Sequence, residues 1–244
     1  MSVTNRQEQI LNILNERTFI TVNELAKMTF TSPSSIRRDL TYLQNNGLAQ
    51  RTHGGVSLPN PIKGVASFYD RSNKNIREKR QIAKKASTLL KDGQNIIIDS
   101  SSTATFLLPY IATYNSCTIF TNNLSTALSA IEFGIKTYCF GGLAISNSIV
   151  LSGPETYRAI SEIKADIIFF SSQSISNNGD IYDSTEEENY VRRLMIKAAK
   201  KSVFLCDSTK FNKTALHKLC NIDDIDIAVF NEEFCGLNTK CTIL

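Results

Sequence analysis

SPSSIRRDLTYLQNNGLAQRTHGG, residues 32–55, decides the fold of the N-terminal part of this chain. The serine and proline that open it predict a helix start, because serine caps free N–H groups and proline fits the first helical position. Ile36, Leu40 and Leu43 then recur at the spacing of one helical face. Gly47 is the kind of residue that ends a helix. The stretch therefore predicts one amphipathic helix that stops at this glycine.

The polar face of this helix is basic and carries short side chains. Hydroxyl groups near a helix N-terminus allow a phosphate to come close, and the N-terminus itself attracts anions. Arginine side chains one turn further can reach base edges or the DNA backbone. We therefore expect this face to bind DNA. Its candidate residues are Ser34, Ser35, Arg37, Arg38 and Thr41.

Two further helices and a hairpin surround this helix in the sequence. Apolar spacing predicts helices over residues 4–17 and 21–29. After the helix, LAQRTHGGVSL predicts a two-stranded ribbon that turns at Gly54-Gly55 and carries Arg51 and His53 as further DNA contacts. Three helices and a hairpin form a winged helix-turn-helix, whose third helix enters the major groove.

The charge of the chain is divided unevenly. The 244 residues carry a formal net charge of +4. Residues 1–91 hold 15 Lys and Arg against 6 Asp and Glu, whereas residues 92–244 hold 12 against 17. This division predicts that the N-terminal end meets a polyanion. The alternative is a solvated basic helix at residues 74–91.

Cysteine usage and hydropathy bound the class of protein. Six cysteines show no CxxC spacing and are accompanied by two histidines, so we expect no disulfide framework, metal site or cofactor. Cys117, Cys139 and Cys206 adjoin apolar runs and are predicted to be buried thiols. The sequence has no signal-like N-terminus and no apolar stretch of membrane-spanning length. We expect a cytoplasmic protein without membrane contact.

The pattern changes after the N-terminal module. We predict a DNA-binding domain at residues 1–58, a linker at 59–74 and a second domain at 75–244. In the second domain short apolar runs alternate with helical stretches, which predicts an α/β fold with a doubly wound, mostly parallel sheet. The predicted strands are NIIID (95–99), CTIFT (117–121), KTYCF (136–140), IVLSG (149–153), DIIFF (166–170), SVFLC (202–206) and DIAVF (226–230).

Polar residues follow four of these strands. The carboxyl ends of parallel strands share one edge of the sheet, where ligands bind. Hydroxyl and N–H groups at a helix start suit a phosphate, Lys210 would supply a charge, and Asp99 and Asp207 could accept protons from sugar hydroxyls. The alternative is ordinary capping and turn chemistry. The candidate ligand-binding residues are Asp99, Ser101, Ser102, Thr103, Thr121, Asn122, Asn123, Gly141, Gly142, Asp207, Ser208 and Lys210.

These motifs together resemble the DeoR-type bacterial transcriptional regulators over nearly the whole chain. The resemblance implies a winged helix-turn-helix that binds operator DNA. It also implies an effector domain similar to ribose-5-phosphate isomerases that senses a phosphorylated sugar. Such regulators are usually homo-oligomeric repressors of sugar-catabolic operons. The residues that carry the resemblance are Ser32, Ile36-Arg37-Arg38-Asp39-Leu40, Gly47, Arg51-Thr52-His53-Gly54-Gly55, Ser102-Thr103, Thr121-Asn122, Gly141-Gly142, Gly153, Glu188, Met195 and Asp207-Ser208-Thr209-Lys210-Phe211.

The chain departs from the family pattern at three places. Ser101 stands where the family typically has a glycine, which narrows the approach to the backbone. Ser35 replaces a threonine, and residues 171–174 (SSQS) replace a glycine-containing loop. The last two changes leave the expected fold as it is. The changed loop at residues 171–174 is expected to alter the shape of the ligand-binding pocket.

The alternative function is a sugar-phosphate isomerase. Aldose–ketose isomerisation needs a base and an acid at the sugar. The isomerases that the second domain resembles carry an aspartate pair after the strand equivalent to DIIFF, but residues 171–179 (SSQSISNNG) contain no carboxylate before Asp180. Glu188 could act as a lone base, although it also suits the start of the helix predicted at 188–200. We therefore expect a sensor and not an enzyme.

Overall fold

The computed structural model describes residues 4–16, 20–52, 55–57, 68–145 and 149–244. The chain divides into two compact units, Met1–Val65 and Ala66–Leu244. The second unit starts earlier than the sequence predicts. A short helix, α4 (Phe68–Ser72), lies inside the expected linker at 59–74, and its Phe68 is only 4% exposed.

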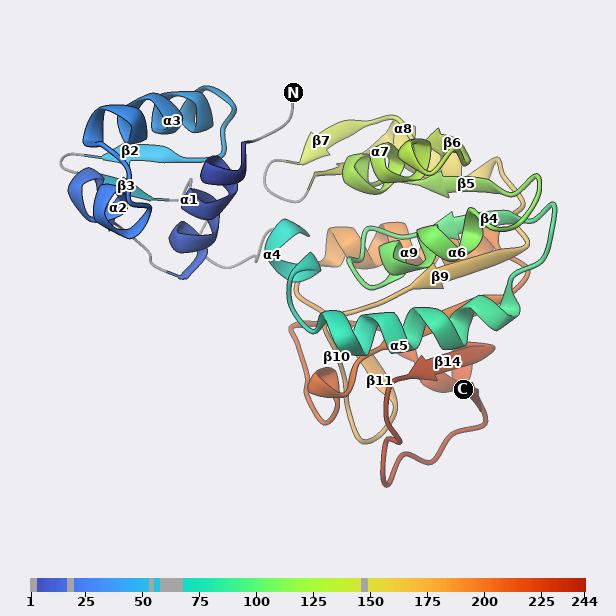
Figure 1. Ribbon diagram of the computed structural model, residues 1–244. Coiled ribbons are helices and arrows are strands. Elements are labelled where there is room, and N and C mark those ends of the chain that lie inside the picture. Colours follow the sequence, from blue (N-terminus) through green and yellow to red (C-terminus); the bar gives the residue numbers. More distant parts are fainter. Residues whose placement is uncertain (1–3, 17–19, 53–54, 58–67, 146–148) are drawn as a thin grey trace. The chain divides into compact units, whose positions relative to one another are not determined.

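The N-terminal unit is a three-helix cluster with a small antiparallel sheet (Figure 1). Ile10 from the first helix packs with Leu25 from the second and Ile36 from the third in one buried core. The strand order β1-β3-β2 adds one strand that the sequence analysis did not predict. The winged helix-turn-helix prediction is confirmed. The elements are α1 (Asn5–Glu16), β1 (Ile20–Thr21), α2 (Val22–Met28), α3 (Pro33–Asn45), β2 (Gln50–Thr52) and β3 (Gly55–Ser57).

The C-terminal unit is built on a seven-stranded sheet of order β15-β14-β12-β9-β4-β5-β6. All of its described pairings are parallel, which confirms the predicted fold class. The central strands are buried on both faces, as their continuous apolar sequences require. The strands are β4 (Asn95–Ile98), β5 (Thr118–Thr121), β6 (Lys136–Cys139), β9 (Ile167–Phe170), β12 (Ser202–Cys206), β14 (Ile227–Phe230) and β15 (Thr242–Ile243).

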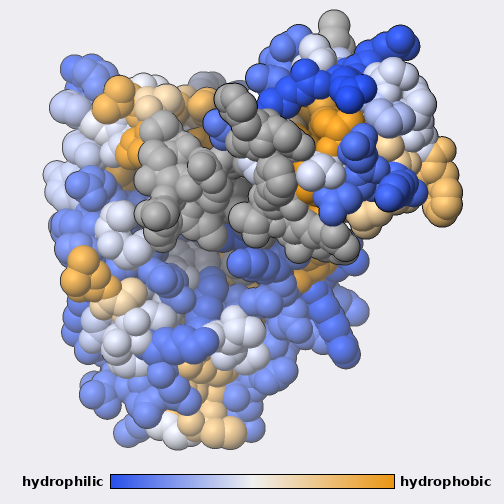
Figure 2. All heavy atoms as spheres, turned by 90° about the vertical axis from the view of Figure 1, so that its left-hand side faces the viewer, coloured by the Kyte–Doolittle hydropathy of each residue, from blue (hydrophilic) through white to orange (hydrophobic). Residues whose placement is uncertain are grey.

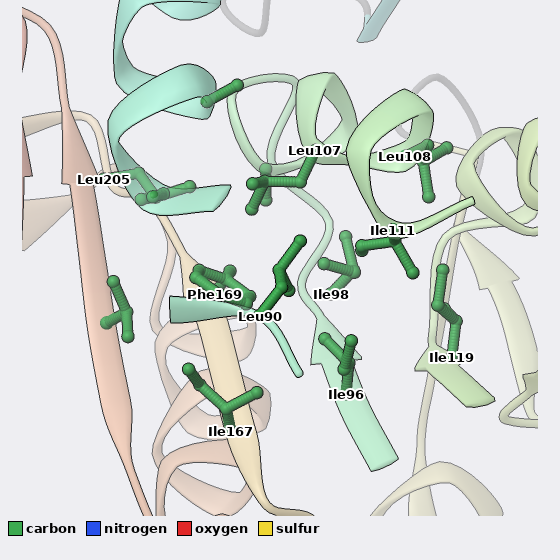
Figure 3. Close-up of a cluster of buried hydrophobic side chains, with 14 of the residues drawn as sticks. Leu90, Ile96, Ile98, Leu107, Leu108, Ile111, Ile119, Ile167, Phe169 and Leu205 are labelled. Carbon is green, nitrogen blue, oxygen red and sulfur yellow. The ribbon is translucent and has the colours of Figure 1, made fainter. Parts of the chain in front are cut away.

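Helices cover both faces of this sheet. Ile96 and Ile98 point to one face, where they pack with Leu107 and Ile111 (Figure 3). Ile97, between them, packs in the second core on the opposite face, as the two-residue period of a strand dictates. The first face is covered by α5 (Ile76–Ala86), a 3₁₀ turn (Ala104–Leu107), α6 (Leu108–Ile111) and α7 (Leu124–Glu132). The second face is covered by α8 (Pro154–Ser161) and α9 (Glu186–Ala198).

Short strands are where the structure departs most from the prediction. The run 149–153 does not join the parallel sheet; β8 (Val150–Ser152) instead pairs antiparallel with β7 (Leu143–Ile145). The helix expected at 103–112 begins as the 3₁₀ turn. A further antiparallel sheet consists of β10 (Ser174–Ile175), β11 (Asp180–Asp183) and β13 (His217–Asn221). Shorter 3₁₀ turns lie at Ser87–Leu89, Ser208–Lys210 and Ile222–Asp224.

The cysteine prediction is correct for two of the three thiols. Cys117 and Cys206 are buried, and burial raises the pKa of Cys206 to about 12. Cys139 is exposed, because its strand β6 lies at the edge of the sheet. No described helix combines the length and apolar character needed to cross a membrane.

Candidate functional site

Helix α3 presents its polar face as the sequence predicts. Ser32 caps the helix by accepting a hydrogen bond from the Ser35 backbone N–H at 3.3 Å. Ser34, Arg37, Arg38 and Thr41 are exposed, and Ser35 is half-buried. Within the described part of the chain, neither arginine has a carboxylate partner. Both guanidinium groups are therefore available to an external anion.

The wing is connected to this helix near its middle. Arg51 of β2 donates through Nη2 to the Arg37 carbonyl oxygen at 3.0 Å, and Thr41 Oγ1 donates to the same oxygen at 2.8 Å. Arg51 and Arg37 therefore lie side by side on one basic surface. His53, the remaining predicted DNA contact, lies outside the described residues, as does most of the turn of the hairpin.

Asp39 is a residue whose structural role the sequence analysis missed. It is 5% exposed and accepts hydrogen bonds from Arg6 Nε at 2.5 Å and Gln7 Nε2 at 3.3 Å. This carboxylate ties α1 to α3. It thereby fixes the orientation of the helix whose other side carries the exposed arginines.

In the C-terminal unit, the predicted ligand-binding loops do share one edge of the sheet. The strand order places the residues after β12, β9, β4, β5 and β6 in succession along the carboxyl edge. The loop after β9 joins this edge through Ser171, which is 1% exposed. Because the sheet is parallel, all of these loops lie at one end of it.

Lys210 reaches across two strand ends. Its Nζ donates to Ser171 Oγ at 2.9 Å and lies 3.6 Å from Asp207 Oδ2. Asp207 is fully buried, and its Oδ1 accepts a hydrogen bond from Asn75 Nδ2 at 3.2 Å and another from Thr209. Its Oδ2 accepts no hydrogen bond from a described residue. An acceptor next to a cation is thus left for a ligand.

Lys79 is a second cation at this edge, and the sequence analysis missed it. It is 4% exposed; its Nζ donates to Ser102 Oγ at 3.2 Å and to the backbone oxygen of Arg71. Burial, reinforced by the charge of Lys210, lowers the pKa of Lys79 to about 8. A sequence signal existed, since Lys79 lies at helical spacing from Ile82 and so falls on the buried stripe of α5.

A buried ion pair network lies beneath these loops. Arg192 Nε is 3.0 Å from Asp99 Oδ2, and Arg192 Nη1 is 2.9 Å from Asp183 Oδ2. Burial opposes the charge of Arg192, but the carboxylates of Asp183, Asp99 and Glu188 raise its pKa above the usual value. This network is a long-range feature that no local pattern reveals.

The network changes the role expected for Asp99. Besides Arg192, its oxygens accept hydrogen bonds from the Ser101 backbone N–H at 3.0 Å, from Ser101 Oγ at 2.5 Å and from the Ser171 backbone N–H at 3.3 Å. With these oxygens engaged by the protein, Asp99 positions the loop and is not an open acceptor for a sugar hydroxyl.

Ser101, the residue at the family's glycine position, points toward Asp99. Its hydroxyl also accepts a hydrogen bond from the Ala104 backbone N–H at 3.3 Å. The next two residues, Ser102 and Thr103, are buried, and no described residue accepts a hydrogen bond from their backbone N–H groups. These N–H groups start the turn that leads into α6, which is a favourable position for an anion.

The loop after β5 combines capping with unused polar atoms. Thr121 Oγ1 accepts from the Asn123 backbone N–H at 3.2 Å, and Asn123 Oδ1 caps α7 by accepting from the Thr126 backbone N–H at 2.9 Å. Asn122 Nδ2 donates to the Leu151 backbone oxygen at 3.0 Å. Within the described ranges, Asn122 Oδ1 and Asn123 Nδ2 are buried without a hydrogen bond. Thr121 thus stabilises the turn before α7, whose cap is Asn123, and within the described ranges the side-chain amides of Asn122 and Asn123 retain one free group each.

Gly141, Gly142 and Ser208 are held by local packing. The Gly141 backbone oxygen accepts from Thr156 Oγ1 at 2.5 Å. A Cβ on Gly142 would lie 2.6 Å from the Ser152 backbone oxygen and would also collide with Thr156. The Ser208 backbone N–H donates to Asn231 Oδ1 at 2.8 Å. Close approach to β8 and α8 requires a glycine at position 142, whereas a Cβ on Gly141 would meet no atom of a described residue within 4 Å.

Acidic residues near the site do not form a catalytic pair in the expected loop. Glu188 lies in the first turn of α9, and burial raises the pKa of its carboxyl group. The residues that follow β9 are serines up to Gln173. In the described ranges, no group of three His, Cys, Asp or Glu side chains is arranged to hold a metal ion.

An exposed basic helix in one unit and a polar strand-end site in the other define a DNA-binding regulator that responds to a small ligand. Residues 6–61 match the model of the DeoR-like helix-turn-helix domain, and residues 74–232 match that of the DeoR C terminal sensor domain. The chain belongs to the DeoR family of transcriptional regulators, which confirms the resemblance seen in the sequence. It is a regulator and not an enzyme.

Curated relatives cover nearly the whole chain. The HTH-type transcriptional regulator GolR of Listeria innocua is 33% identical over 92% of this chain and 89% of its own. The L-fucose operon activator of Haemophilus influenzae is 34% identical over 91% of this chain and 89% of its own. The HTH-type transcriptional repressor GlcR of Bacillus subtilis is 30% identical over 93% of this chain and 90% of its own.

Solved structures match part of this chain at low sequence identity. Ribose 5-phosphate isomerase A of Methanocaldococcus jannaschii matches 57% of this chain with a TM-score of 0.43 and 16% identity. The chain spans 55% of the length of that isomerase. The beta subunit of eIF2B from Chaetomium thermophilum matches 63% of this chain with a TM-score of 0.45 and 14% identity.

Proposed function

We propose that this protein represses a sugar-catabolic operon and that a phosphorylated sugar releases it from operator DNA. The observation that supports a phosphorylated effector is that Lys79 and Lys210 both reach the strand-end loops, where they bond Ser102 and Ser171. Two cations held close together with a hydroxyl and free N–H groups suit a phosphate dianion. Relatives named for fucose, lactose and aga operons support a sugar as the rest of the ligand.

The DNA step uses the exposed face of α3. Arg37 and Arg38 enter the major groove and bind base edges or phosphates, while Ser34 and the helix N-terminus approach the backbone. Arg51 extends the basic surface on the wing, where its side chain is already bonded to the backbone of α3. Operator DNA and a second copy of this chain are the macromolecular partners in this proposal.

The ligand step uses groups with complementary charge. The ammonium groups of Lys79 and Lys210 and the N–H groups of residues 102–103 hold the phosphate. Asp207 Oδ2 and Asn122 Oδ1, both buried without a hydrogen bond within the described residues, accept protons from sugar hydroxyls. Asn123 Nδ2 is a matching donor. Each of these atoms gains a partner when the ligand binds.

The same residues connect the ligand to the link between the units. Lys79 bonds the Arg71 carbonyl oxygen in α4, the first described helix after residues 58–67. Asn75, with a left-handed φ of 52°, bonds both Asp207 at 3.2 Å and Thr209 at 3.0 Å. A phosphate that draws Lys79 toward itself weakens its bond to α4. The ligand thereby changes the geometry of the turn between α4 and α5. The DNA-binding unit precedes α4 in the chain, so this turn is the connection through which the change would reach it.

A ligand screen followed by gel shifts tests this proposal. Thermal shifts with a panel of aldose and ketose phosphates identify the effector, which at 100 times its dissociation constant adds about 2.7 kcal/mol of stability. Gel shifts on the DNA upstream of the regulated operon then show whether that compound releases the protein. A compound that instead strengthens binding or promotes transcription would make the protein an activator, as in the Haemophilus relative.

Lys210→Ala provides the site test. We expect unchanged operator binding but an effector affinity roughly 10- to 150-fold lower, because a charge-assisted contact is lost. Lys200→Ala is the matched control, since Lys200 pairs with Asp166 at 2.9 Å at the opposite end of the sheet. Undiminished affinity in the Lys210 variant would place the phosphate elsewhere, and the basic helix α5 would be examined next.

A further inference from the structure

Most of the positive charge in the first 91 residues lies outside the DNA-binding unit. Residues 1–65 hold 7 Lys and Arg against 4 Asp and Glu, whereas residues 66–91 hold 8 against 2. The formal net charges of these two segments are therefore +3 and +6. Two thirds of the excess that predicts contact with a polyanion thus belongs to the start of the C-terminal unit, where α4 and α5 lie.

Helix α5 turns three of these cations to its outer side. Arg77, Arg80 and Lys84 are exposed and follow one another at intervals of three and four residues, which places them on one helical face. The opposite face, with Ile82 and Ala86, packs in the core against the sheet. At a rise of 1.5 Å per residue, the three cations extend over about 10 Å. We refer to Arg77, Arg80 and Lys84 as the α5 basic stripe.

The α5 basic stripe lines a hollow in the surface together with other polar side chains. The hollow has a volume of about 490 Å³, and Ile76, Gln81 and Tyr110 of α6 complete its lining. Arginine, lysine, glutamine and tyrosine are among the side chains that bind the phosphate oxygens of DNA. The stripe and its neighbours therefore form a continuous set of donors for anionic oxygens.

The lack of acidic partners distinguishes the α5 basic stripe from an ordinary solvated helix. The exterior drawn in Figure 2 is mainly hydrophilic, so exposed charge alone does not mark a binding surface. Solvated helix faces usually alternate acidic and basic side chains. Within the described ranges, however, no carboxylate forms an ion pair with any of the three cations, although Glu78 lies on the same helix. A row of cations without such partners is the electrostatic pattern of a nucleic-acid-binding surface.

We propose that the α5 basic stripe binds the phosphate backbone of operator DNA and adds a sequence-independent contact to the one that α3 makes. DNA is the polyanion that a regulator of this family already holds. Once α3 has bound, the tethered C-terminal unit meets DNA phosphates at a high effective concentration, so weak contacts are sufficient. One DNA strand presents about three phosphates over 10 Å of duplex, which matches the three cations in number and length.

The salt dependence of DNA binding tests the proposal on the full chain. The triple variant Arg77→Gln, Arg80→Gln and Lys84→Gln removes three phosphate contacts. Its plot of log affinity against log salt concentration should be less steep than that of the wild type by roughly 2.7. Between 50 and 200 mM salt its affinity should therefore fall roughly 40-fold less than that of the wild type. Operator and random duplexes should change alike, because phosphate contacts carry no sequence information.

The matched control is the triple variant Lys164→Gln, Lys197→Gln and Lys201→Gln. These lysines are exposed and lie in or after α8 and α9, the helices of the opposite face of the sheet. Each triple variant lowers the formal net charge from +4 to +1, so general charge effects are the same in both. The control should keep the wild-type salt slope. Equal slopes in the two variants would overturn the proposal, whether the stripe is then a solvated surface or binds a small anion or an acidic protein.

Photocrosslinking from position 81 gives an independent measurement that leaves the stripe intact. Gln81 lines the hollow beside the cations. In a Cys139→Ser, Cys235→Ser background, which removes the two exposed native thiols, an aryl azide attached through Gln81→Cys should crosslink to operator DNA. The same label attached through Lys197→Cys should not. Crosslinking no stronger from position 81 than from position 197 would contradict the proposal.

This inference rests on operator binding by α3, and the two can fail separately. The preference of the wild-type chain for operator over random DNA tests α3 and the regulatory function. The salt slope of the stripe variant tests α5. A chain that prefers the operator but keeps its full salt slope in the stripe variant retains the proposed function and loses only this contact.

Discussion

The change Lys79→Met distinguishes a cation held for a ligand from a structural lysine. The substitution keeps most of the length and apolar stem of the side chain and removes its charge. In the folded protein burial lowers the pKa of this ammonium from 10.5 to about 8. Such a difference corresponds to about 3 kcal/mol of destabilisation of the charged form at neutral pH.

The net effect on stability follows from the contacts of Lys79. Methionine removes the burial cost but also the hydrogen bonds to Ser102 and to the Arg71 backbone. Each hydrogen bond contributes about 1 kcal/mol. The unliganded variant should therefore be more stable than the wild type by about 1 kcal/mol at pH 7. Its affinity for the effector should fall roughly 10- to 150-fold, because a charge-assisted contact to phosphate is lost.

The pH dependence has a definite sign. Between pH 8 and about 10.5 the unfolded chain holds a proton on Lys79 that the folded chain has released, so stability contributed by this group rises with pH in that window. Bound phosphate favours the ammonium form, so binding takes up a proton and affinity falls above about pH 8. Both effects should be absent in Lys79→Met.

Urea denaturation at pH 7 and 9 measures the stability, and titration calorimetry in two buffers measures the affinity and the proton uptake. Lys85→Met is the matched control, because Lys85 is an exposed lysine of the same helix that donates to the Phe230 backbone oxygen at 2.8 Å. A Lys79→Met protein that is less stable and keeps its effector affinity would refute the reasoning, since that result describes a structural lysine.

Three further predictions concern DNA binding, activity and the buried network. Arg37→Ala and Arg38→Ala should each weaken operator binding by roughly 1–3 kcal/mol, and gel shifts on specific and random duplexes at two salt concentrations separate base from phosphate contacts; wild-type affinity in both would reject α3 as the recognition helix. The purified protein should not interconvert ribose 5-phosphate and ribulose 5-phosphate above background, and turnover at ordinary enzyme rates would contradict the sensor. Arg192→Met should lower the free energy of unfolding, measured by urea denaturation, by roughly 3–5 kcal/mol, because the buried carboxylates of Asp99 and Asp183 lose their partner. A loss under about 1 kcal/mol would contradict this, since it would mean that the two carboxyl groups become neutral at little cost.

Local sequence patterns predicted the elements that are locally determined. The Ser32 cap and the buried Ile36 and Leu40 of α3 follow from spacing within one turn or two. The parallel sheet followed from continuous apolar runs, because a strand buried on both faces needs no polar side chains. These features depend on neighbours in the sequence, which is why they could be predicted.

The missed features depend on residues far apart in the chain. Arg192 contacts Asp99 across 93 positions, and no local pattern brings them together. Lys79 was not named as a site residue, because the basic stretch at 74–91 was read only for its net charge, although the position of Lys79 falls on the apolar stripe of the helix. The strands β7 and β8 have three residues each, which is too short for alternation to identify their pairing.

Asp207 Oδ2 restricts which ligands can bind by their hydrogen-bond donors as well as by their charge. It is buried beside Lys210, without a hydrogen bond from any described residue. A compound that supplies only unprotonated anionic oxygens would bring another acceptor toward this carboxylate and would be repelled. A compound that places a hydroxyl proton there satisfies it. Sites that require such a donor reject analogues lacking it by as much as roughly 10⁴-fold. Sulfate, which carries no proton at neutral pH, would therefore be a poor mimic of the proposed effector, and the deoxy form of that effector would be a sensitive probe of its identity.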